Sequence, residues 1–530
     1  MTTRTLFIGM DGATFTVLDD LTAGPEPVMP FMASLFANGS RAKLRSTPNP
    51  LTPPAWVSLT TGRSPGNHGV FDFIRAEESG DDVFFTLYDS RDCRVETIWS
   101  IISRSGQRVA ALNFPFTAPP PSDLDGFMVP GFVPWRHLRR NCVPKGLYDR
   151  LKSIPDFDPK ELAWDFEQEK QALDELSDEG REDWVRYHLP REMQWFRIAD
   201  YLLREESPEL MAVMFDGVDK LQHQAWLYVD PAQQHSESSD YHRRMRALCL
   251  DYFRQLDGFI ERLVTAAGPD VQVFLASDHG FCATHEIVRI NTFLHERGYL
   301  RWHDAPESAA DKRREDSMFA YLDWDATVAY CGTPSSNGIT IRVAKEPGAG
   351  GVPPQEYEAL RDRLIADLRD FRDPDSGEPI ITEVHKREDV FPGPAMNDAP
   401  DLLLVLRDHG FVSIKNKAPA VEPRPTIAGT HHPDGVFIAH GPGIRKGATV
   451  DRRNIVDVGA TLLHSLGLPV PKDFEGKVPV DMFTREHQRA CPVKVGAPTR
   501  GQRTDEDAQS MSDHEKDQIM AQLQMLGYVE

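Results

Sequence analysis

The side chains most able to do chemistry in this sequence are carboxylates, imidazoles and one hydroxyl, and most follow short apolar runs. Asp11 follows the run 5–10, where a plain turn is its alternative role, and Asp278 with His279 follows the run 271–276. Carboxylate oxygen and imidazole nitrogen together suit zinc, with manganese or iron as alternatives. The full candidate set is Asp11, Thr52, Asp219, His223, Asp278, His279 and His431.

The hydroxyl belongs to Thr52, within residues 47–70 (TPNPLTPPAWVSLTTGRSPGNHGV). Two prolines follow it, and proline favours the first turn of a helix. Unpaired N–H groups and the helix dipole at such a terminus favour a bound anion and a partly ionised oxygen. Taken alone, the segment favours a plain helix cap at Thr52, and the ligand-type residues elsewhere in the chain turn the prediction to a phosphate-binding nucleophile.

Two pairs of candidates depend on local spacing. Asp219 and His223 follow an apolar run and are four residues apart, so on a helix they project from one face and can bind one cation. A surface pair is the alternative. Asp278 and His279 are adjacent and can share a metal only in a turn, which we expect Gly280 to supply.

The last candidates lie in segments that we expect to be loops. Residues 428–435 read AGTHHPDG, and His431 or His432 can supply a further nitrogen ligand, although either one alone is typical of a loop. Asn113 follows the apolar run 109–112. Its amide can contact substrate or merely cap a turn.

Taken together, these groups predict the chemistry of a two-metal site. Three carboxylates carry −3 against the +4 of two divalent ions, and the surplus positive charge favours a phosphate. Two ions about 4 Å apart can clamp the attacking and leaving oxygens of an in-line displacement. Coordination lowers the pKa of the Thr52 hydroxyl enough to make its oxygen a nucleophile, and water then releases the phosphoryl group from the enzyme.

The elements that must position these groups alternate between short buried strands and amphipathic helices, which predicts an α/β fold. Ligands bind at the carboxyl edge of the strands in such folds. Charged helical sequence and a less regular segment interrupt the pattern, and we interpret both as cap insertions. The expected parts are core 1–133, helical cap 134–192, core 193–299, α+β cap 300–420, core 421–485, and a flexible tail with a C-terminal helix at 486–530.

The overall charge limits the class of partner. The chain has 530 residues, with 59 Lys and Arg against 81 Asp and Glu, and a formal net charge of −22. Nucleic-acid scaffolds normally present a basic face, so we expect a small phosphorylated substrate and no nucleic-acid polymer. Six scattered cysteines without a CxxC pair indicate neither a zinc ribbon nor a disulfide framework.

The sequence pattern also bears on location. The first residues, MTTRTLFIGMDG, enter an expected strand at once and lack the apolar core and cleavage site of a signal peptide. No apolar run approaches the roughly 20 residues that cross a bilayer. We therefore expect a soluble, cytoplasmic protein without a membrane span.

Five motifs in order carry a family resemblance: FIGMDG, LTPPAWVSLTTGRSPGNHG, DGVDKLQH, SDHG and GTHHPDG. Over residues 4–480 the chain resembles the alkaline phosphatase superfamily, in the branch of type I phosphodiesterases and nucleotide pyrophosphatases. It is similar to the bacterial group of predicted phosphohydrolases and phosphomutases. The resemblance implies a central, mostly parallel sheet between helices with inserted caps, and hydrolysis of a phosphodiester or pyrophosphate through a phosphothreonine at Thr52.

The resemblance also divides the candidates between two divalent ions, with zinc preferred. His431 is chosen over His432 because the family pattern is Gly-x-His. One ion is implied to bind Asp219, His223 and His431. The other is implied to bind Asp11, Asp278, His279 and Thr52.

One departure from the family pattern bears on the substrate. The nucleotide pyrophosphatases resembled here have His-Gly-x-x-Asp-Asn, whose asparagine binds a phosphate oxygen, while this chain reads His68-Gly-Val-Phe-Asp72-Phe73. Asn113 is the candidate to supply that amide. A phosphomonoesterase or phosphomutase is the alternative on the same fold. A sulfatase would need the Cys/Ser-x-Pro-x-Arg motif, which is absent around Thr52. A non-catalytic binding protein is the alternative outside enzymes.

Overall fold

The computed structural model describes residues 3–79, 82–133, 135–162, 178–233, 239–303, 319, 322–333 and 335–501. Its core is a nine-stranded sheet in the order β17-β2-β16-β8-β1-β7-β5-β6, with β18 paired to β2. The strands of this sheet are β1 (Thr5–Met10), β2 (Ser40–Arg45), β5 (Val109–Leu112), β6 (Gly126–Val129), β7 (Leu210–Phe215), β8 (Gln272–Ala276), β16 (Asp434–His440), β17 (Ala448–Thr449) and β18 (Arg453–Asn454).

Most strand pairs of the core sheet are parallel. β1 pairs in parallel with β7 and β8, and β5 pairs in parallel with β6 and β7. β16 runs antiparallel to β2 and β8. Every residue of β1 is buried, as expected for a parallel strand that is covered on both faces. The predicted α/β fold with a central, mostly parallel sheet is confirmed.

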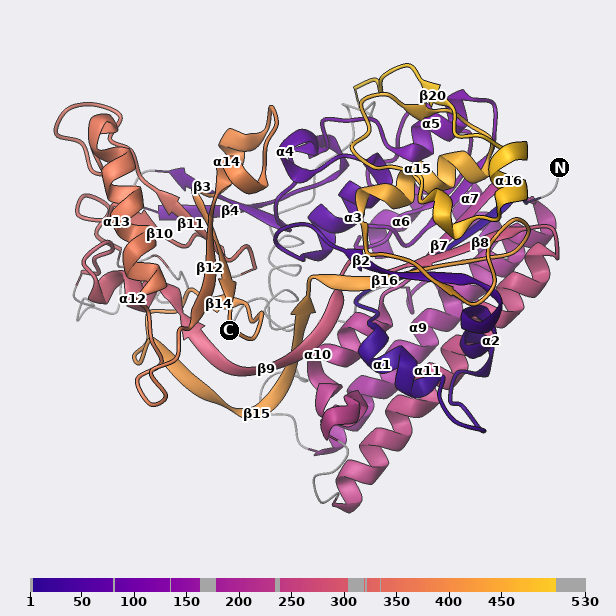
Figure 1. Ribbon diagram of the computed structural model, residues 1–530, viewed down its shortest axis with the longest axis horizontal. Helices are drawn as coiled ribbons and strands as arrows, with labels where there is room; N and C mark the ends of the chain where they lie inside the picture. The colour runs from indigo at the N-terminus through magenta and orange to yellow at the C-terminus, as the bar shows by residue number, and fades with distance from the viewer. Residues whose placement is uncertain are drawn as a thin grey trace.

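Helices cover both faces of the sheet (Figure 1). Leu6 and Ile8 of β1 join the apolar cluster that includes α2, α9, α10 and α11, whereas Phe7 joins the cluster that includes α3, α5 and α15. Successive strand side chains point to opposite faces, which explains why β1 is apolar throughout. The bounds are α2 (Pro30–Asn38), α3 (Thr52–Thr61), α5 (Ile98–Arg104), α9 (Asp178–Glu205), α10 (Gly217–Val229), α11 (Asp240–Ala267) and α15 (Val456–Ser465).

Helix α9 connects the end of the expected helical insertion to the core. α9 crosses the boundary that we expected between 192 and 193, because its second half packs on the sheet and on α11. Residues 163–177 lie outside the described part. Shorter helices on the core are α1 (Phe15–Leu21), α4 (Pro65–His68), α6 (Trp135–Asn141) and α7 (Leu147–Leu151).

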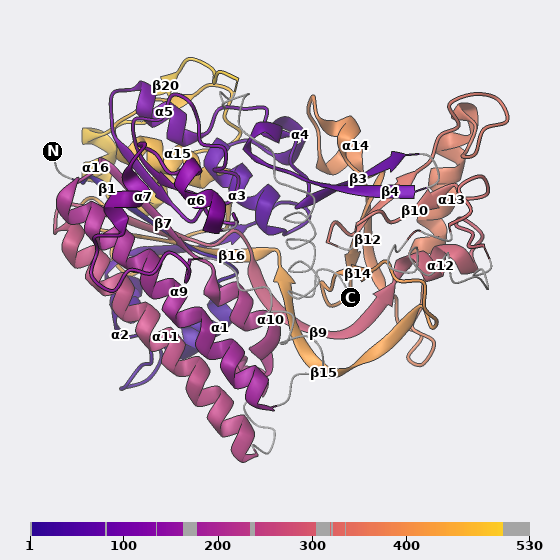
Figure 2. The ribbon, with the colours of Figure 1, turned by 180° about the vertical axis from the view of Figure 1, so that it is seen from behind.

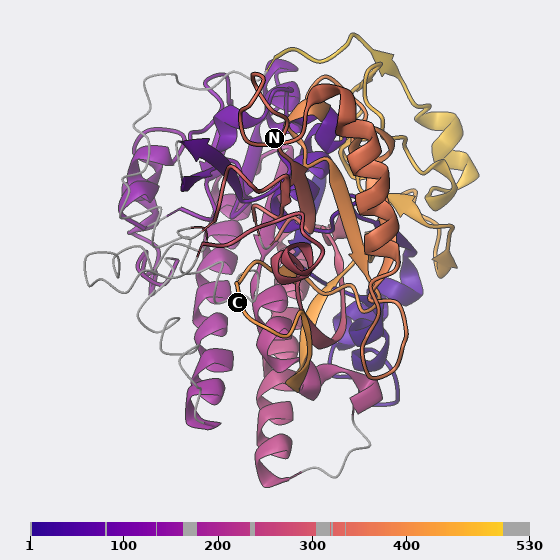
Figure 3. The same ribbon diagram turned by 90° about the vertical axis from the view of Figure 1, so that its left-hand side faces the viewer.

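The α+β cap has its own sheet and its own apolar core. Its sheet has the order β10-β11-β13-β12, and α13 lies along it (Figure 3). Two long antiparallel strands, β9 (Gly280–Arg289) and β15 (Val421–His432), lead from the core into the cap and back (Figure 1). The remaining cap elements are β10 (Ala329–Tyr330), β11 (Gly338–Ile341), β12 (Ile381–Lys386), β13 (Leu402–Leu406), β14 (Val412–Ser413), α12 (Ile290–Glu296), α13 (Tyr357–Arg369) and α14 (Arg387–Val390).

The cap also docks directly on the core beside α4. A hairpin of β3 (Ile74–Ser79) and β4 (Asp82–Leu87) reaches from this region toward the cap (Figure 2). The rings of Phe71 and Phe391 meet edge to face, with centroids 5.2 Å apart. A Cβ atom on Gly66 would lie 2.2 Å from the carbonyl oxygen of Phe391, so the two backbones are in contact there.

Gly280 does not supply the turn that we expected. It begins the long strand β9, and the bend after β8 is made by residues 277–279. The glycine is required for space, since a Cβ atom on it would lie 2.1 Å from the carbonyl oxygen of Asp434. His431 likewise lies in strand β15, paired opposite Phe281, and not in a loop.

The described residues from 485 onward pack on the core. They form α16 (Arg485–Ala490) and β20 (Val495–Gly496), which pairs with β19 (Val470–Pro471). The Arg500 N–H donates to Glu96 Oε2 at 2.9 Å. These contacts differ from the flexible tail expected at 486–530, and the expected C-terminal helix lies outside the described residues. No helix in the described ranges is long and apolar enough to cross a membrane.

Candidate active site

Three neighbouring strands bring the candidate residues to one edge of the sheet. Asp11 follows β1, Asp278 and His279 follow β8, and α10, which carries Asp219, follows β7. β1 lies between β8 and β7 and is parallel to both. The carboxyl ends of all three strands therefore meet at one place, the usual ligand-binding edge of such a sheet.

One group of ligand atoms forms around Asp219. Its Oδ1 lies 3.1 Å from His431 Nε2 and 3.4 Å from His223 Nε2, and the two ring nitrogens are 3.1 Å apart. Asp219 and His223 lie one helical turn apart on α10, while His431 comes from β15. The three residues expected to bind one ion are thus in mutual contact.

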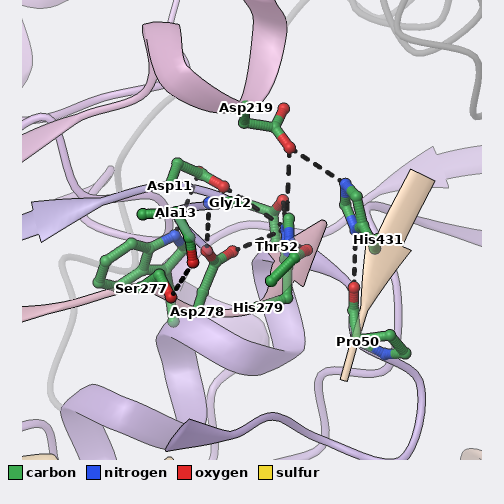
Figure 4. A network of polar contacts seen from close by, with 12 residues as sticks. Asp11, Gly12, Ala13, Pro50, Thr52, Asp219, Ser277, Asp278, His279 and His431 are labelled. Atoms are coloured by element: carbon green, nitrogen blue, oxygen red, sulfur yellow. Dashed lines mark hydrogen bonds and ion pairs between the residues drawn. The ribbon is translucent and has the colours of Figure 1, made fainter. Parts of the chain in front are cut away.

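A second group forms around His279. Its Nε2 lies 3.2 Å from Asp278 Oδ2 and 3.5 Å from Asp11 Oδ1. The Thr52 Oγ1 lies 3.3 Å from the same nitrogen, and Thr52 is the first residue of α3. The side chains of this group point toward one another in Figure 4.

His279 links the two groups, which the sequence did not indicate. Its Nε2 also lies 3.9 Å from Asp219 Oδ1, and its ring stacks on that of His431 with centroids 3.4 Å apart. By distance, the sets able to hold an ion are Asp219, His279 and His431, and Asp11, Asp278 and His279. All seven predicted residues therefore belong to one buried cluster, with His279 between its halves.

The electrostatics of the cluster fit divalent cations. No group in the described part of the chain donates a hydrogen bond to Asp11 Oδ1 or Asp278 Oδ2, although both oxygens are buried. Burial, and then repulsion from Asp219, raises the pKa of Asp278 to about 8, while burial and Asp278 raise the pKa of Asp11. A buried carboxylate oxygen without a donor is costly, and a bound cation removes that cost.

His279 and His431 are in the form that binds metal. Burial, with His431 nearby, lowers the pKa of His279, so its ring is neutral. Its Nδ1–H donates to the Gly280 carbonyl at 3.0 Å, and His431 Nδ1–H donates to the Pro50 carbonyl at 2.7 Å. Each bond fixes the tautomer and leaves Nε2 directed into the cluster (Figure 4).

Supporting contacts around the cluster include residues that sequence reasoning missed. Trp56 Nε1 donates to Asp11 Oδ2 at 3.2 Å, and the Gly12 N–H donates to Asp278 Oδ1 at 3.1 Å. Trp56 lies one turn into α3, so the helix that carries Thr52 also holds Asp11. A tryptophan in an apolar helix gives no sequence signal for such a contact.

Asn113 is engaged with protein groups. Its Nδ2 donates to the Met214 carbonyl at 2.9 Å and to Asp216 Oδ1 at 3.3 Å. These bonds use both N–H groups of the amide. The amide nitrogen of Asn113 therefore binds the carboxyl end of β7 and the residue after it.

His431 and His432 provide a matched pair for testing the cluster. His432 points away from it and packs edge to face against His409, with centroids 4.9 Å apart. We expect His431→Ala to lose at least one equivalent of bound metal, while His432→Ala keeps the full content. Elemental analysis of the purified variants checks this. Equal metal loss in both variants would contradict the assignment.

Solved structures of other proteins share the fold of this chain. Murine ectonucleotide pyrophosphatase/phosphodiesterase 5, solved as an inactive variant in complex with AMP, is 15% identical with a TM-score of 0.53, covering 91% of this chain and 100% of that chain. Phosphonoacetate hydrolase from Sinorhizobium meliloti 1021, solved with phosphonoformate, is 14% identical with a TM-score of 0.51, covering 88% and 95%. At these identities the structures establish the fold alone. No curated protein matches the chain.

The family assignment comes from the sequence match, which spans most of the chain. The family described as type I phosphodiesterase / nucleotide pyrophosphatase matches residues 5–434. That range contains the whole buried cluster, from Asp11 to His431. The chain belongs to the type I phosphodiesterase / nucleotide pyrophosphatase family, within the alkaline phosphatase superfamily.

Proposed function

We propose that this chain is a metal-dependent phosphohydrolase that cleaves a phosphodiester or pyrophosphate bond, with Thr52 as the nucleophile. The observation that supports this best is the position of the Thr52 hydroxyl. It is 2% exposed, begins helix α3, and lies 3.3 Å from His279 Nε2 in the middle of the cluster. A threonine that only capped its helix would not need three buried carboxylates and three histidines around it.

The proposed ligands follow the two groups. One divalent ion is held by Asp219, His223 and His431, and the other by Asp11, Asp278, His279 and Thr52. Zinc suits this mixture of oxygen and nitrogen, with manganese or iron as alternatives. When bound, such ions neutralise the phosphoryl oxygens, lower the pKa of a coordinated hydroxyl and activate water. His279 lies between the groups, so its loss should affect both.

The protein groups then have separate tasks. The Thr52 hydroxyl gives up its proton to solvent, and its oxygen attacks phosphorus in line as the bond to the leaving ester oxygen breaks; the leaving oxygen takes a proton from solvent. Thr52 then carries the phosphoryl group together with the ester substituent that remains on it. The positive end of the α3 dipole favours an anion at Thr52, although Pro53 and Pro54 have no N–H and the Ala55 N–H donates to the Leu51 carbonyl. Water attacks phosphorus in this intermediate, the bond to the Thr52 oxygen breaks, the hydroxyl is regenerated and a phosphate monoester leaves. Burial of the cluster keeps these charge interactions strong, because little solvent screens them.

The proposed substrate is a small phosphorylated molecule. The AMP complex of the murine relative supports a nucleotide-like phosphate ester as the first compound to try. This chain has Phe73 where the resembled pattern has the phosphate-binding asparagine, and both N–H groups of Asn113 are occupied. The test should therefore include phosphate esters without a nucleoside.

The test combines metal analysis with a panel of esters. Protein loaded with zinc is assayed on bis(4-nitrophenyl) phosphate, 4-nitrophenyl phosphate and a dinucleoside pyrophosphate. We expect about two metal ions per chain and turnover of the diester or pyrophosphate that a chelator abolishes and zinc restores. Turnover of the monoester alone would favour the phosphomonoesterase alternative. Two bound ions without turnover of any ester would contradict the catalytic proposal.

A further inference from the structure

A buried carboxylate joins the core to the cap close to the nucleophile. Asp72 is 3% exposed and follows α4 in the core. Its Oδ1 accepts hydrogen bonds from Ser335 Oγ at 2.6 Å and from the Phe73 N–H at 2.6 Å, and its Oδ2 accepts one from Thr333 Oγ1 at 2.7 Å. Ser335 and Thr333 belong to the cap segment before β11. One core carboxylate therefore holds two hydroxyls of the cap.

Ser335 also holds the loop that leads to Thr52. The Ser335 carbonyl accepts a hydrogen bond from Asn49 Nδ2 at 3.0 Å, and both residues are buried. The Asn49 carbonyl in turn accepts a hydrogen bond from the Leu51 N–H at 2.8 Å. Leu51 is the residue immediately before α3. A continuous path of short contacts thus runs from Asp72 through Ser335 and Asn49 to the start of the nucleophile helix.

Further hydrogen bonds hold the cap residues next to this path in place. Asn337 Nδ2 donates to the Gly410 carbonyl at 3.1 Å, and Asn337 Oδ1 accepts from the Val412 N–H at 2.9 Å. Phe411, between those two residues, packs edge to face on His431 with centroids 5.1 Å apart. The segment that contacts Asp72 is therefore tied to the strand that carries a proposed metal ligand.

We propose that Asp72 is a positioning residue for the nucleophile. Its contacts through Ser335 and Asn49 make the position of Thr52 depend on how the cap docks on the core. The inference rests on the proposed function of Thr52. A shift of about 1 Å in a reacting atom can lower the rate roughly 100-fold. Contacts that fix the loop before Thr52 therefore affect the rate of turnover. The path specifies where the nucleophile stands and takes no part in the bond changes.

Two other roles for Asp72 fit the structure less well. It borders a cavity of about 740 Å³ between the hairpin and the cap, where a carboxylate can serve a ligand. Both of its oxygens already accept hydrogen bonds from protein groups, which favours the positioning role. If Asp72 had a purely structural role, losing either cap hydroxyl would have the same effect. The positioning role predicts different effects, because only Ser335 contacts Asn49 as well as Asp72.

The test compares Asp72→Ala and Asn49→Ala, alone and combined, with Thr333→Val as the matched control. Thr333→Val removes a hydrogen bond to the same carboxylate but leaves the path to Asn49 intact. With bis(4-nitrophenyl) phosphate we expect each path variant to lower kcat by about 10- to 100-fold, with KM changed less than about 2-fold and metal content unchanged. The control should keep kcat within about 2-fold of the wild type.

The double variant decides whether the residues act as one path. Residues on a common path are not additive, so the combined kcat loss should equal the larger single loss. Multiplied losses, or a control as impaired as Asp72→Ala, would overturn the inference. If Asp72→Ala fails to fold, Asn49→Ala alone decides: an unchanged kcat overturns the inference. A wild type without any turnover overturns the proposed function together with it, whereas an active wild type with unaffected variants overturns the inference alone.

Discussion

Replacing Thr52 with alanine is expected to lower kcat on a phosphodiester by roughly 1,000-fold or more, because no hydroxyl remains to attack phosphorus. The change removes only an oxygen and a methyl group from the first turn of α3. The carboxylates and imidazoles of the cluster remain, so the variant should still bind metal. Steady-state kinetics together with elemental analysis separate loss of the nucleophile from loss of the ions.

Two controls sharpen this result. Thr52→Ser keeps a hydroxyl on the same carbon and should retain measurable turnover. Thr60→Ala removes a hydroxyl from the same helix, where it donates to the Trp56 carbonyl at 2.9 Å, and should leave kcat within about 2-fold. Acid-quenched wild type incubated with labelled phosphodiester should carry on Thr52 the labelled phosphoryl group with its remaining ester substituent. Wild-type turnover in Thr52→Ala would refute the proposed nucleophile.

Replacing His279 with alanine is expected to have a comparably large effect through the metal site. Its Nε2 lies 3.2 Å, 3.5 Å and 3.9 Å from oxygens of Asp278, Asp11 and Asp219. Loss of the ring removes a ligand and leaves a cavity between both groups. We expect bound metal to fall from about two ions to one or fewer, and kcat to fall by roughly 1,000-fold.

Thermal unfolding provides an independent readout for His279. Ions that bind only the folded protein stabilise it, so a chelator should lower the unfolding midpoint of the wild type more than that of His279→Ala. His464→Ala is the control, since this buried histidine packs against Phe483 in the core. It should keep its metal and its response to the chelator. An unchanged metal content in His279→Ala would contradict the central position of that ring.

Short-range sequence patterns were enough to place most of the candidate residues on their elements. The apolar runs at β1, β7 and β8 are buried strands, and Asp11, Asp278 and the start of α10 follow them directly. The four-residue spacing of Asp219 and His223 places both on one turn of α10. Such features depend on neighbours within one or two turns of chain, which is why the sequence could specify them.

The boundaries of the caps could not be predicted from local sequence patterns. α9 continues across the boundary expected at 192, and the strands β9 and β15 extend the cap beyond 300–420. A helix or strand ends where its packing partners end, and those partners are distant in sequence. The docked segment after residue 485 has the same explanation, since β20 exists only because β19 pairs with it.

What the sequence determined by itself is the set of chemical groups, the elements that carry them, and the edge of the sheet at which they would meet. Only the tertiary structure decided the distances. It placed the ring of His279 between two metal groups, put His431 in a strand opposite Phe281, and joined Asp72 to Asn49 through the cap. Those contacts link residues far apart in the chain, and close packing between elements fixes them, which local propensity cannot do.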